Sequence, residues 1–400
     1  MTFFKENYFL ILLLLFATLS RFLFLFIYPE LNFPDARAYQ KIGHEIFSGE
    51  LITNNIYMPL YPILTYITGG GITQKIADIF LSLGVIIVIY ALSMQLFNNK
   101  VSALIAVFIS SLYPHFLFYA VSGLTETLFT FLLLLAFLLF YKKFFFLGIV
   151  ILALTVLVRP TLDFLNPLLV FSFSFFVFRK GYYQSIRQVF IYIFIYIVVM
   201  SPWWVHQYQK YGEFIRLSLG DGVVLYSGNN PLNVTGGGVG VGNLGVRDMD
   251  TTQFKHIKDP VERNQAMKEV AIDYIFNNPG HFIELAGVKF LRFWRLWPHT
   301  EHYQQWYTIA ASLLSYGLIL VLSIGFMFKY LRIYFWKLTP VFALFGYLTL
   351  VHMVTIGSIR YRFPLEPFLI IFASYFANEL MKKNRYFKIL QNRLIKGLGN

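Results

Sequence analysis

Long apolar runs, separated by short charged connections, are the feature that most restricts how this chain can fold. A helix needs roughly 20 apolar residues to cross a bilayer, and a window of that length finds about ten such runs. They are Phe9–Tyr28, Lys75–Phe97, Val101–Ala120, Gly123–Tyr141, Phe144–Val158, Leu162–Phe178, Val189–Val205, Trp306–Phe328, Leu338–Ile356 and Phe363–Leu380. Only 13% of the 400 residues are charged, whereas soluble domains carry about 25%. The sequence therefore predicts an all-α polytopic membrane protein with about ten to twelve transmembrane helices.

The apolar runs also define the predicted parts of the chain. These are an N-terminal membrane module at 1–205 with a first outer loop at 29–74, a large and partly irregular outer loop at 206–305, C-terminal transmembrane helices at 306–381 and a basic cytoplasmic tail at 382–400. Within the first loop, Met58–Gly71 is apolar but interrupted by two prolines and three glycines. This composition fits three alternatives: a re-entrant segment, an interfacial segment or an eleventh span. The first run lacks a small-residue cleavage site and is expected to be retained as a span.

The distribution of basic residues predicts the orientation. With the N-terminus in the cytoplasm, most lysines and arginines of the short connections and the tail lie inside, as the positive-inside rule requires. Three arginines on the outer face are exceptions: Arg159, Arg360 and Arg362. A single arginine there is explained by contact with lipid phosphates. Three on one face favour a bound phosphate or pyrophosphate at headgroup level, so they are the candidate donor phosphate-binding residues.

The segment Asn32–Glu50, directly after the first run, is the candidate catalytic loop. Apolar residues recur there at helical spacing between charged ones, which predicts an amphipathic helix lying along the membrane surface. Asp35 at its start places a carboxylate where it can take a proton from an acceptor or hold a metal, although it could equally cap the helix. Tyr39 and His44 on the same helix are candidate contacts of the acceptor.

Glu126 is the second candidate catalytic residue. It stands at the start of the fourth apolar run, one residue after Thr125. An acid at a helix N-terminus is favoured by the helix dipole, which would make it structural. A carboxylate at membrane depth is costly unless it is paired or functional, so both interpretations stay open.

The large outer loop is too long for a simple connection. Its glycine-rich part, Leu232–Arg247, matches neither a phosphate-binding loop nor a dinucleotide fingerprint, so a flexible flap over a site and a disordered connection remain equal alternatives. Asn229 and Asn230 before it are further candidate contacts of the acceptor. Asp259-Pro260 predicts a helix start, and a basic aromatic stretch near Phe290–Trp297 predicts an interfacial helix.

Several classes of site are excluded or unsupported. The chain has no cysteine, so thiolate metal sites and thiol nucleophiles are absent. His44, His115 and His206 match no metal-binding spacing. No motif implies a cofactor, and the need for a divalent metal stays open. The basic residues form no soluble patch, so nucleic acid is not an expected partner.

In combination, these segments resemble the C-type membrane glycosyltransferases, closest to bacterial relatives of protein O-mannosyltransferases and of the lipid A aminoarabinose transferase. The resemblance rests on the order of the pieces: the Asp35 loop, Thr125-Glu126, Arg159-Pro160-Thr161, Pro202-Trp203-Trp204, Gly228-Asn229-Asn230-Pro231, the stretch Phe290–Trp297 and Arg360-Tyr361-Arg362-Phe363-Pro364. Many relatives carry a second acid directly after the aspartate of the first loop. Ala36 stands there in this chain, which speaks against a two-carboxylate metal site in that loop.

The resemblance implies an inverting transferase in a bacterial-type cytoplasmic membrane, acting on its outer face. It would move a sugar from a polyprenyl-phosphate donor to a lipid, glycan or protein acceptor, with Asp35 as general base. The alternatives are a flippase or transporter for a lipid-linked sugar, a surface-polysaccharide polymerase or ligase, and a structural membrane protein. A transporter would need inverted repeats and a charged path through the midplane, which the sequence does not show.

Overall fold

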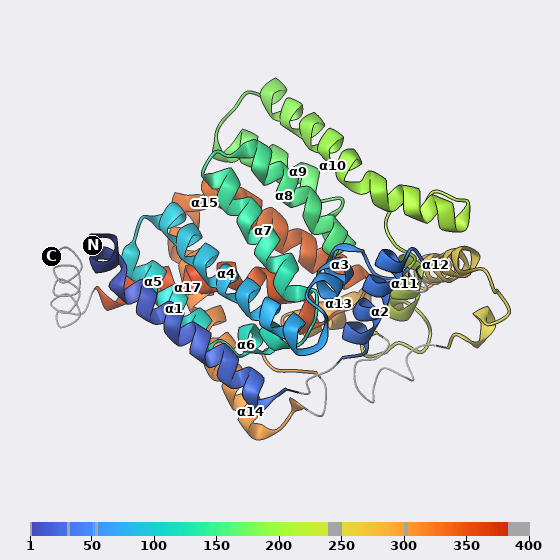
Figure 1. Cartoon of the computed structure of the whole chain (residues 1–400), viewed down its shortest axis with the longest axis horizontal. Helices are drawn as coiled ribbons and strands as arrows, with labels where there is room; N and C mark the ends of the chain where they lie inside the picture. The colour runs from blue at the N-terminus through green and yellow to red at the C-terminus, as the bar shows by residue number, and fades with distance from the viewer. Residues whose placement is uncertain are drawn as a thin grey trace.

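Helices account for every regular element in the part of the chain that the structure describes. The computed structural model describes residues 2–29, 33–50, 52, 55–238, 250–299 and 303–382, with side chains from residue 7 onward. Its α-helices are α1 (Thr2–Ile27), α2 (Pro34–Ser48), α3 (Leu60–Ile67), α4 (Gly71–Phe97), α5 (Lys100–Leu112), α6 (Pro114–Val121), α7 (Glu126–Tyr141), α8 (Phe145–Val158), α9 (Asn166–Ser172), α10 (Tyr182–Tyr211), α11 (Asp221–Gly228), α12 (Pro260–Asn277), α13 (Pro279–Phe293), α14 (Trp306–Ser312), α15 (Leu318–Val354), α16 (Ile359–Arg362) and α17 (Glu366–Met381) (Figure 1). The all-helical prediction is confirmed for these residues.

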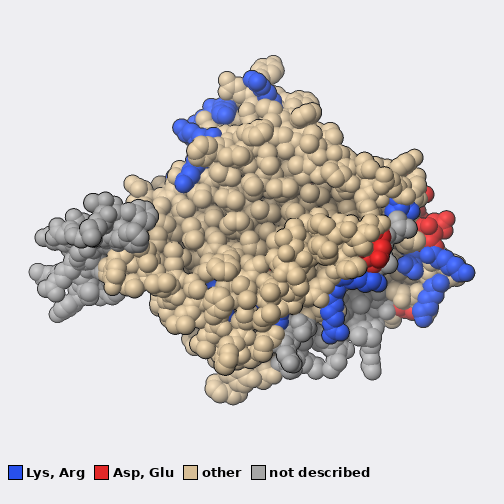
Figure 2. Space-filling model, viewed as in Figure 1, with Lys and Arg blue, Asp and Glu red and all other residues tan. Residues whose placement is uncertain are grey.

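Four described helical runs are long and apolar enough to cross a membrane. They are Asn7–Ile27, Gly71–Phe97, Tyr182–Tyr211 and Trp306–Val354, and the bent pair of α5 and α6 can count as a fifth. The predicted spans at 123–141, 144–158 and 162–178 appear as shorter apolar helices. On the face shown in Figure 2, charged side chains gather over the α9–α10 connection and over the α11–α12 region, with a broad uncharged surface between them. The count of ten spans remains a prediction.

The run from Trp306 to Val354 reverses direction within its length. The guanidinium of Arg362 lies 3.6 Å from the ring centroid of Tyr316, and the ring of His352 stacks at 4.4 Å on Tyr361. Tyr316 and His352 thus sit beside neighbouring residues, although a straight helix would separate them by about 50 Å. Between them, Lys337 Nζ donates to the carbonyls of Gln95 and Leu96. The run therefore turns back near Lys337 and contains both spans predicted at 306–328 and 338–356.

The predicted span at Val101–Ala120 is divided between two helices and remains a prediction. The chain bends by 56° between α5 and α6, at Tyr113-Pro114. Pro114 has no N–H, so the carbonyl of Ser110 loses its helical donor. The guanidinium of Arg21, fully buried in α1, donates instead to the carbonyls of Ser110 at 3.2 Å and Ser111 at 3.3 Å. A buried arginine from another helix thus stabilises the break.

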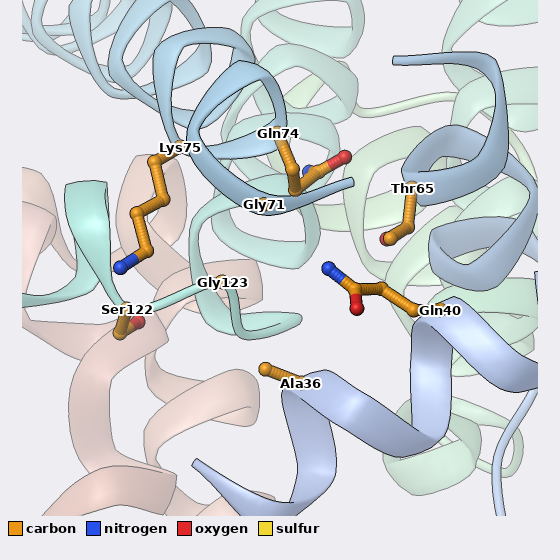
Figure 3. A pocket seen from close by; sticks show the side chains of 8 residues that line it. All are labelled: Ala36, Gln40, Thr65, Gly71, Gln74, Lys75, Ser122 and Gly123. Atoms are coloured by element: carbon orange, nitrogen blue, oxygen red, sulfur yellow. The ribbon is translucent and has the colours of Figure 1, made fainter. Parts of the chain in front are cut away.

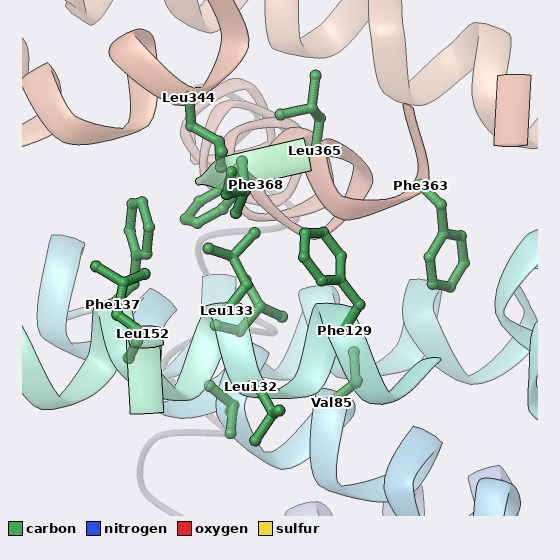
Figure 4. Packing of buried hydrophobic residues seen from close by; sticks show 14 of the residues in the cluster. Val85, Phe129, Leu132, Leu133, Phe137, Leu152, Leu344, Phe363, Leu365 and Phe368 are labelled. Carbon is green, nitrogen blue, oxygen red and sulfur yellow. The ribbon is translucent and has the colours of Figure 1, made fainter. Parts of the chain in front are cut away.

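Helix α7 lies at the centre of the membrane module and holds its first residue rigidly. Phe129, Leu132, Leu133 and Phe137 of α7 are buried in the main hydrophobic cluster. Figure 4 shows them between Val85 of α4, Leu152 of α8 and a group from the C-terminal helices: Leu344, Phe363, Leu365 and Phe368. Because close packing resists displacement, Glu126 at the start of α7 is held in a fixed position.

The large outer loop contains the predicted helices and a small core of its own. Helix α12 begins at Pro260, where Asp259 accepts from the backbone N–H groups of Val261 and Glu262. Helices α11 and α12 enclose a separate apolar cluster: Tyr226, Phe254, Met267 and Ala271. The seventh predicted span extends further than expected, since α10 continues to Tyr211.

The described part of the glycine-rich segment is anchored. The carbonyl of Gly236 accepts from the N–H of Gly357 at 3.0 Å. Asn233 donates to the carbonyls of Ser227 and Gly237. Hydrogen bonds thus hold residues 233–237 in this structure, residues 239–247 lie outside the described residues, and the flap and the disordered connection remain alternatives.

Candidate active site

Asp35 is the second residue of α2 and does not cap that helix. The N-cap position is Phe33, Pro34 is the first helical residue, and no side-chain cap bond forms. Instead, Asp35 Oδ1 accepts from the hydroxyl of Tyr57 at 2.9 Å, and Oδ2 accepts from Arg360 Nη1 at 2.9 Å. The capping alternative is therefore wrong, and both carboxylate oxygens are directed at specific partners.

Glu126 is completely buried and is paired with two arginines. Its Oε1 accepts from Arg159 Nη1 at 2.7 Å and from Arg360 Nε. Its Oε2 has no hydrogen-bond partner among the described residues. A buried carboxylate without a cation would be strongly disfavoured, so the two guanidiniums account for its stability there. Gly123, with φ +66°, makes the turn that separates α6 from this helix start.

Arg360 joins the two carboxylates. It comes from the short helix α16, where the hydroxyl of Ser358 accepts from its backbone N–H. Gly357, just before, is tightly enclosed, because a Cβ there would lie 2.5 Å from the carbonyl of Lys289. The glycine-rich segment and α13 thus fix the backbone that carries Arg360. Asp35, Glu126, Arg159 and Arg360 form a charge-balanced group, which we call the acid–arginine cluster.

The cluster does not fit a divalent-metal site. The two carboxylates already share a cation, the guanidinium of Arg360, which bridges Asp35 Oδ2 and Glu126 Oε1. A metal held by both would have to displace it, and hard divalent cations prefer several oxygen ligands. No three His, Asp or Glu side chains come together within the described ranges.

The guanidinium of Arg159 lies near two aromatic rings. Because the residue before a proline is disfavoured in a helix, α8 ends at Val158 and Arg159 adopts an extended backbone. Its guanidinium lies 5.4 Å from the ring centroid of Tyr361 and 5.9 Å from that of Phe129. Only one of its nitrogens is bonded to Glu126, so further N–H donors remain for a ligand.

Arg362 does not join the cluster. It is buried, pairs with Glu366 at 3.0 Å and donates to the carbonyls of Phe293 and Arg295. Glu366 also contacts His115 Nδ1 at 3.1 Å. The guanidinium is thus occupied in tying α13 to α17, and we do not assign it to a phosphate.

Of the remaining predicted residues, Tyr39 lies beside the acid–arginine cluster, whereas His44, Asn229 and Asn230 have partners elsewhere. Tyr39 is buried beside the cluster, and its ring contacts those of Tyr57 and Tyr61; burial raises the pKa of its hydroxyl. His44 is exposed and contacts Tyr66 instead. Asn229 accepts from Lys289 Nζ, and Asn230 donates to the carbonyl of Tyr226. The two asparagines are therefore structural in this conformation.

Three further candidate functional residues were not identified from the sequence. Tyr57 directs Asp35, Tyr361 stacks between Arg159 and His352, and Lys289 is buried behind the backbone of α16. Tyr361 could have been identified from the sequence, because it stands between Arg360 and Arg362. No local pattern marks Tyr57, since its partner lies on another element.

Two small cavities adjoin the cluster. The aromatic cavity, about 10 Å³, is lined by Phe129, Arg159, Thr161, Leu348, His352, Tyr361 and Pro364. The amide cavity, about 20 Å³, is lined by Ala36, Gln40, Thr65, Gly71, Gln74, Lys75, Ser122 and Gly123 (Figure 3). The first combines apolar walls with one guanidinium, and the lining of the second includes two amides, two hydroxyls and one lysine.

Solved structures resemble this chain, although no protein-family model and no curated protein matches it. The oligosaccharyltransferase of Archaeoglobus fulgidus in the apo form gives a TM-score of 0.59 at 12% identity over 98% of this chain. The archaeal oligosaccharyltransferase AglB from the same organism, in complex with an inhibitory peptide and a dolichol-phosphate, gives 0.55 at 12% identity over 98%. This chain spans about half of their length, 53% and 52%. At this identity the likeness shows the fold alone, which this chain shares with these oligosaccharyltransferases.

Proposed function

We propose that this protein transfers a glycosyl group from a polyprenyl-phosphate sugar to an acceptor on the outer face of the membrane. The observation that carries the proposal is the acid–arginine cluster, in which Asp35, Glu126, Arg159 and Arg360 come from four separate helical segments. The fold shared with the oligosaccharyltransferases supports it. So does the dolichol-phosphate bound by one of them, because that molecule is a lipid phosphate.

Asp35 is the general base in this proposal. A base must be ionised and within hydrogen-bond reach of the proton that it takes. Arg360 Nη1 and the hydroxyl of Tyr57 each donate to one oxygen of Asp35 and together orient the carboxylate. Asp35 remains partly exposed, with 27% of its side chain accessible, whereas Glu126 is fully enclosed. Glu126 therefore holds the arginines in place and Asp35 receives the proton.

Arg159 and the aromatic side chains around it form the contact for the donor phosphate, at the surface beside the aromatic cavity and not within its volume of about 10 Å³. An isoprenoid phosphate needs apolar walls for its chain and a cation for its phosphate. Phe129, Leu348 and Tyr361 supply such walls next to Arg159. Arg360 already bridges two carboxylates, so Arg159 is the cation with donors to offer the phosphate.

The transfer step follows from this arrangement. The acceptor oxygen attacks the anomeric carbon as its O–H bond breaks, and the proton passes to Asp35. The bond from the anomeric carbon to the phosphate oxygen breaks on the opposite side, and the phosphate leaves with the electron pair. Arg159 balances the charge that develops on it. A single displacement inverts the anomeric configuration and requires no covalent enzyme intermediate.

The proposal is tested with purified protein in lipid vesicles that contain radiolabelled polyprenyl-phosphate sugars, one sugar at a time. Release of polyprenyl phosphate from at least one donor, by the wild type and not by a folded Asp35→Asn, Arg159→Ala double variant, is the expected result. If the folded wild type leaves every donor intact in the presence of native membrane extract, the proposed function is wrong.

A further inference from the structure

Tyr39 brings a hydroxyl to the acid–arginine cluster from the same face of α2 as Asp35. The two residues are four positions apart, which places their side chains one above the other along one side of the helix. The ring of Tyr39 is enclosed, with its centroid 4.9 Å from that of Tyr57 and 5.1 Å from that of Tyr61, and only 2% of the residue is exposed. Because close packing resists displacement, these rings fix the position of the Tyr39 hydroxyl.

The hydroxyl of Tyr39 is not used by the protein itself. The two neighbouring tyrosines have acceptors, since Tyr57 donates to Asp35 at 2.9 Å and Tyr61 donates to Asp78 at 2.7 Å. Tyr39 makes no hydrogen bond with its hydroxyl to any residue that the structure describes, and this oxygen is not among the polar atoms that the protein encloses without a partner. The hydroxyl therefore keeps contact with solvent, and a bound ligand can reach it.

Charges of both signs surround this hydroxyl. Burial raises the pKa of Tyr39, and four charged side chains act on it in opposing directions: Arg360, Asp35, Glu126 and Arg159. The hydroxyl therefore keeps its proton, and it can both donate and accept a hydrogen bond. Tyr39 thus offers a neutral polar contact in a site whose other members are charged.

The proposed transfer places the donor sugar next to this neutral group. In a single displacement the base and the leaving group lie on opposite sides of the anomeric carbon, so the sugar lies between Asp35 and the phosphate that Arg159 contacts. The hydroxyl of Tyr39 interacts with both of these residues. C2 is the ring carbon bonded to the anomeric carbon. In glycoside hydrolysis, hydrogen bonds to the 2-hydroxyl strengthen in the transition state, and the anomeric carbon develops the same positive charge in glycosyl transfer.

We propose that the hydroxyl of Tyr39 hydrogen-bonds the C2 substituent of the donor sugar, and that the protein requires a donor with a hydroxyl or amide group at C2. This inference rests on the proposed function and adds the class of sugar that the donor carries. It assigns Tyr39 to the donor and not to the acceptor, for which the sequence made it a candidate.

The test compares two donors in lipid vesicles that contain the purified protein, with native membrane extract as the source of acceptor. One is the polyprenyl-phosphate sugar that the wild type consumes, and the other is its analogue with hydrogen in place of the C2 substituent. The rate of polyprenyl phosphate release is measured in a single turnover at saturating donor. Thermal unfolding in detergent shows that each variant is folded.

Three variants each remove a single tyrosine hydroxyl. Tyr39→Phe removes the proposed contact and keeps the ring against its neighbours. Tyr57→Phe removes the hydroxyl that orients Asp35 and should slow both donors by the same factor. The matched control is Tyr66→Phe on α3, because Tyr66 is 44% exposed and its ring stacks on Phe47, outside the cluster.

Tyr39→Phe should release polyprenyl phosphate from the consumed donor about 10-fold more slowly than the wild type, as expected for one lost hydrogen bond. With the analogue the two proteins should agree within about twofold, because the hydrogen bond is absent in both. Tyr66→Phe should behave as wild type with either donor.

Equal slowing of both donors by a folded Tyr39→Phe variant, or no slowing of either, overturns the inference and leaves the proposed function standing. A consumed donor that already carries hydrogen at C2 does the same. A wild type that consumes no donor overturns the proposed function itself.

Discussion

Asp35 is the residue whose replacement separates catalysis from structure most cleanly. Asp35→Asn keeps the size of the side chain and one accepting oxygen, which can serve either Tyr57 or Arg360, but it cannot take a proton. We expect a folded protein that binds donor normally and transfers sugar roughly 10²–10⁴-fold more slowly. The measurement is single-turnover transfer in vesicles beside thermal unfolding in detergent. Near-normal transfer by a folded variant would remove Asp35 from the mechanism and leave Glu126 as the next candidate.

Arg159 and Arg362 should respond differently to the same substitution. Arg159→Ala should weaken donor binding about 10-fold or more, and Arg159→Lys should restore it only in part, because lysine lacks the planar guanidinium. Arg362→Ala removes the guanidinium that pairs with Glu366 in the interior, which leaves Glu366 its contact with His115, and should lower the free energy of unfolding by about 3 kcal/mol or more. Its folded fraction should bind donor with unchanged affinity. Equal losses of donor affinity in both alanine variants would contradict this division.

Individual site residues were predictable where a charged side chain stood at the end of a long apolar run. Asp35, Glu126, Arg159 and Arg360 all stand at or near the ends of predicted spans, where a charged side chain needs a partner or a function. Arg362 satisfied the same rule but fell outside the cluster. In a helix, residues two positions apart point in nearly opposite directions, so Arg360 and Arg362 of α16 cannot serve one ligand together. Sequence spacing in a predicted loop could not reveal that helix.

At the scale of elements, Lys289 links α13 to the backbone before α16. It is completely buried and donates to Asn229 Oδ1 at 2.9 Å and to the carbonyl of Val354 at 3.1 Å, with no described carboxylate paired to it. Burial lowers the pKa of Lys289 from 10.5 to about 7. Between these two values the unfolded chain binds the extra proton, so the free energy of unfolding should rise with pH in this window, by up to about 1 kcal/mol per unit.

The measurement for Lys289 is denaturant unfolding in detergent from pH 7 to 10, for wild type and Lys289→Met. The variant should lose the part of the slope that this lysine contributes, whatever its absolute stability. Every other titrating group is common to both proteins, which makes the difference between slopes specific. Equal slopes would show that Lys289 keeps an ordinary pKa in the folded state.

Arg21 should be a structural residue of the α5–α6 break. Arg21→Met keeps the apolar stem but leaves the carbonyls of Ser110 and Ser111 without their donor. We expect the free energy of unfolding to fall by about 1–3 kcal/mol, with donor binding unchanged in the folded protein. Arg37→Met, on the exposed face of α2, is the matched control and should have little effect. A stable Arg21→Met variant would mean that the break is held by packing alone.

Helices with regularly spaced apolar residues were predictable from the sequence, whereas the breaks and reversals within helical runs were not. The amphipathic pattern located α2, and Asp259-Pro260 located the start of α12. The break at Pro114 and the reversal near Lys337 depend on partners in other helices: Arg21 for the first, and Tyr141, whose hydroxyl donates to the carbonyl of Lys337, for the second. A local window cannot contain such partners.

At the scale of the whole molecule, the prediction concerns orientation across the membrane. The chain has no cysteine, so single cysteines can be labelled with a membrane-impermeant reagent in intact cells and in inverted vesicles. Cysteine at positions 37 and 213 should react from outside, and cysteine at 142 and 333 from the cytoplasm. A further cysteine at position 306, at the start of the helical run that contains α15, should react from outside. Labelling of 306 from outside and of 333 from the cytoplasm would therefore place the reversal of this run on the cytoplasmic side. Labelling of position 37 from the cytoplasmic side alone would refute the topology.

The bridge made by Arg360 has a consequence for how the cluster assembles. Its cation is part of the polypeptide and is delivered by folding, in fixed proportion to the carboxylates that it serves. The four side chains of the cluster therefore meet without a dissolved cation, and the cluster is complete as soon as the chain has folded.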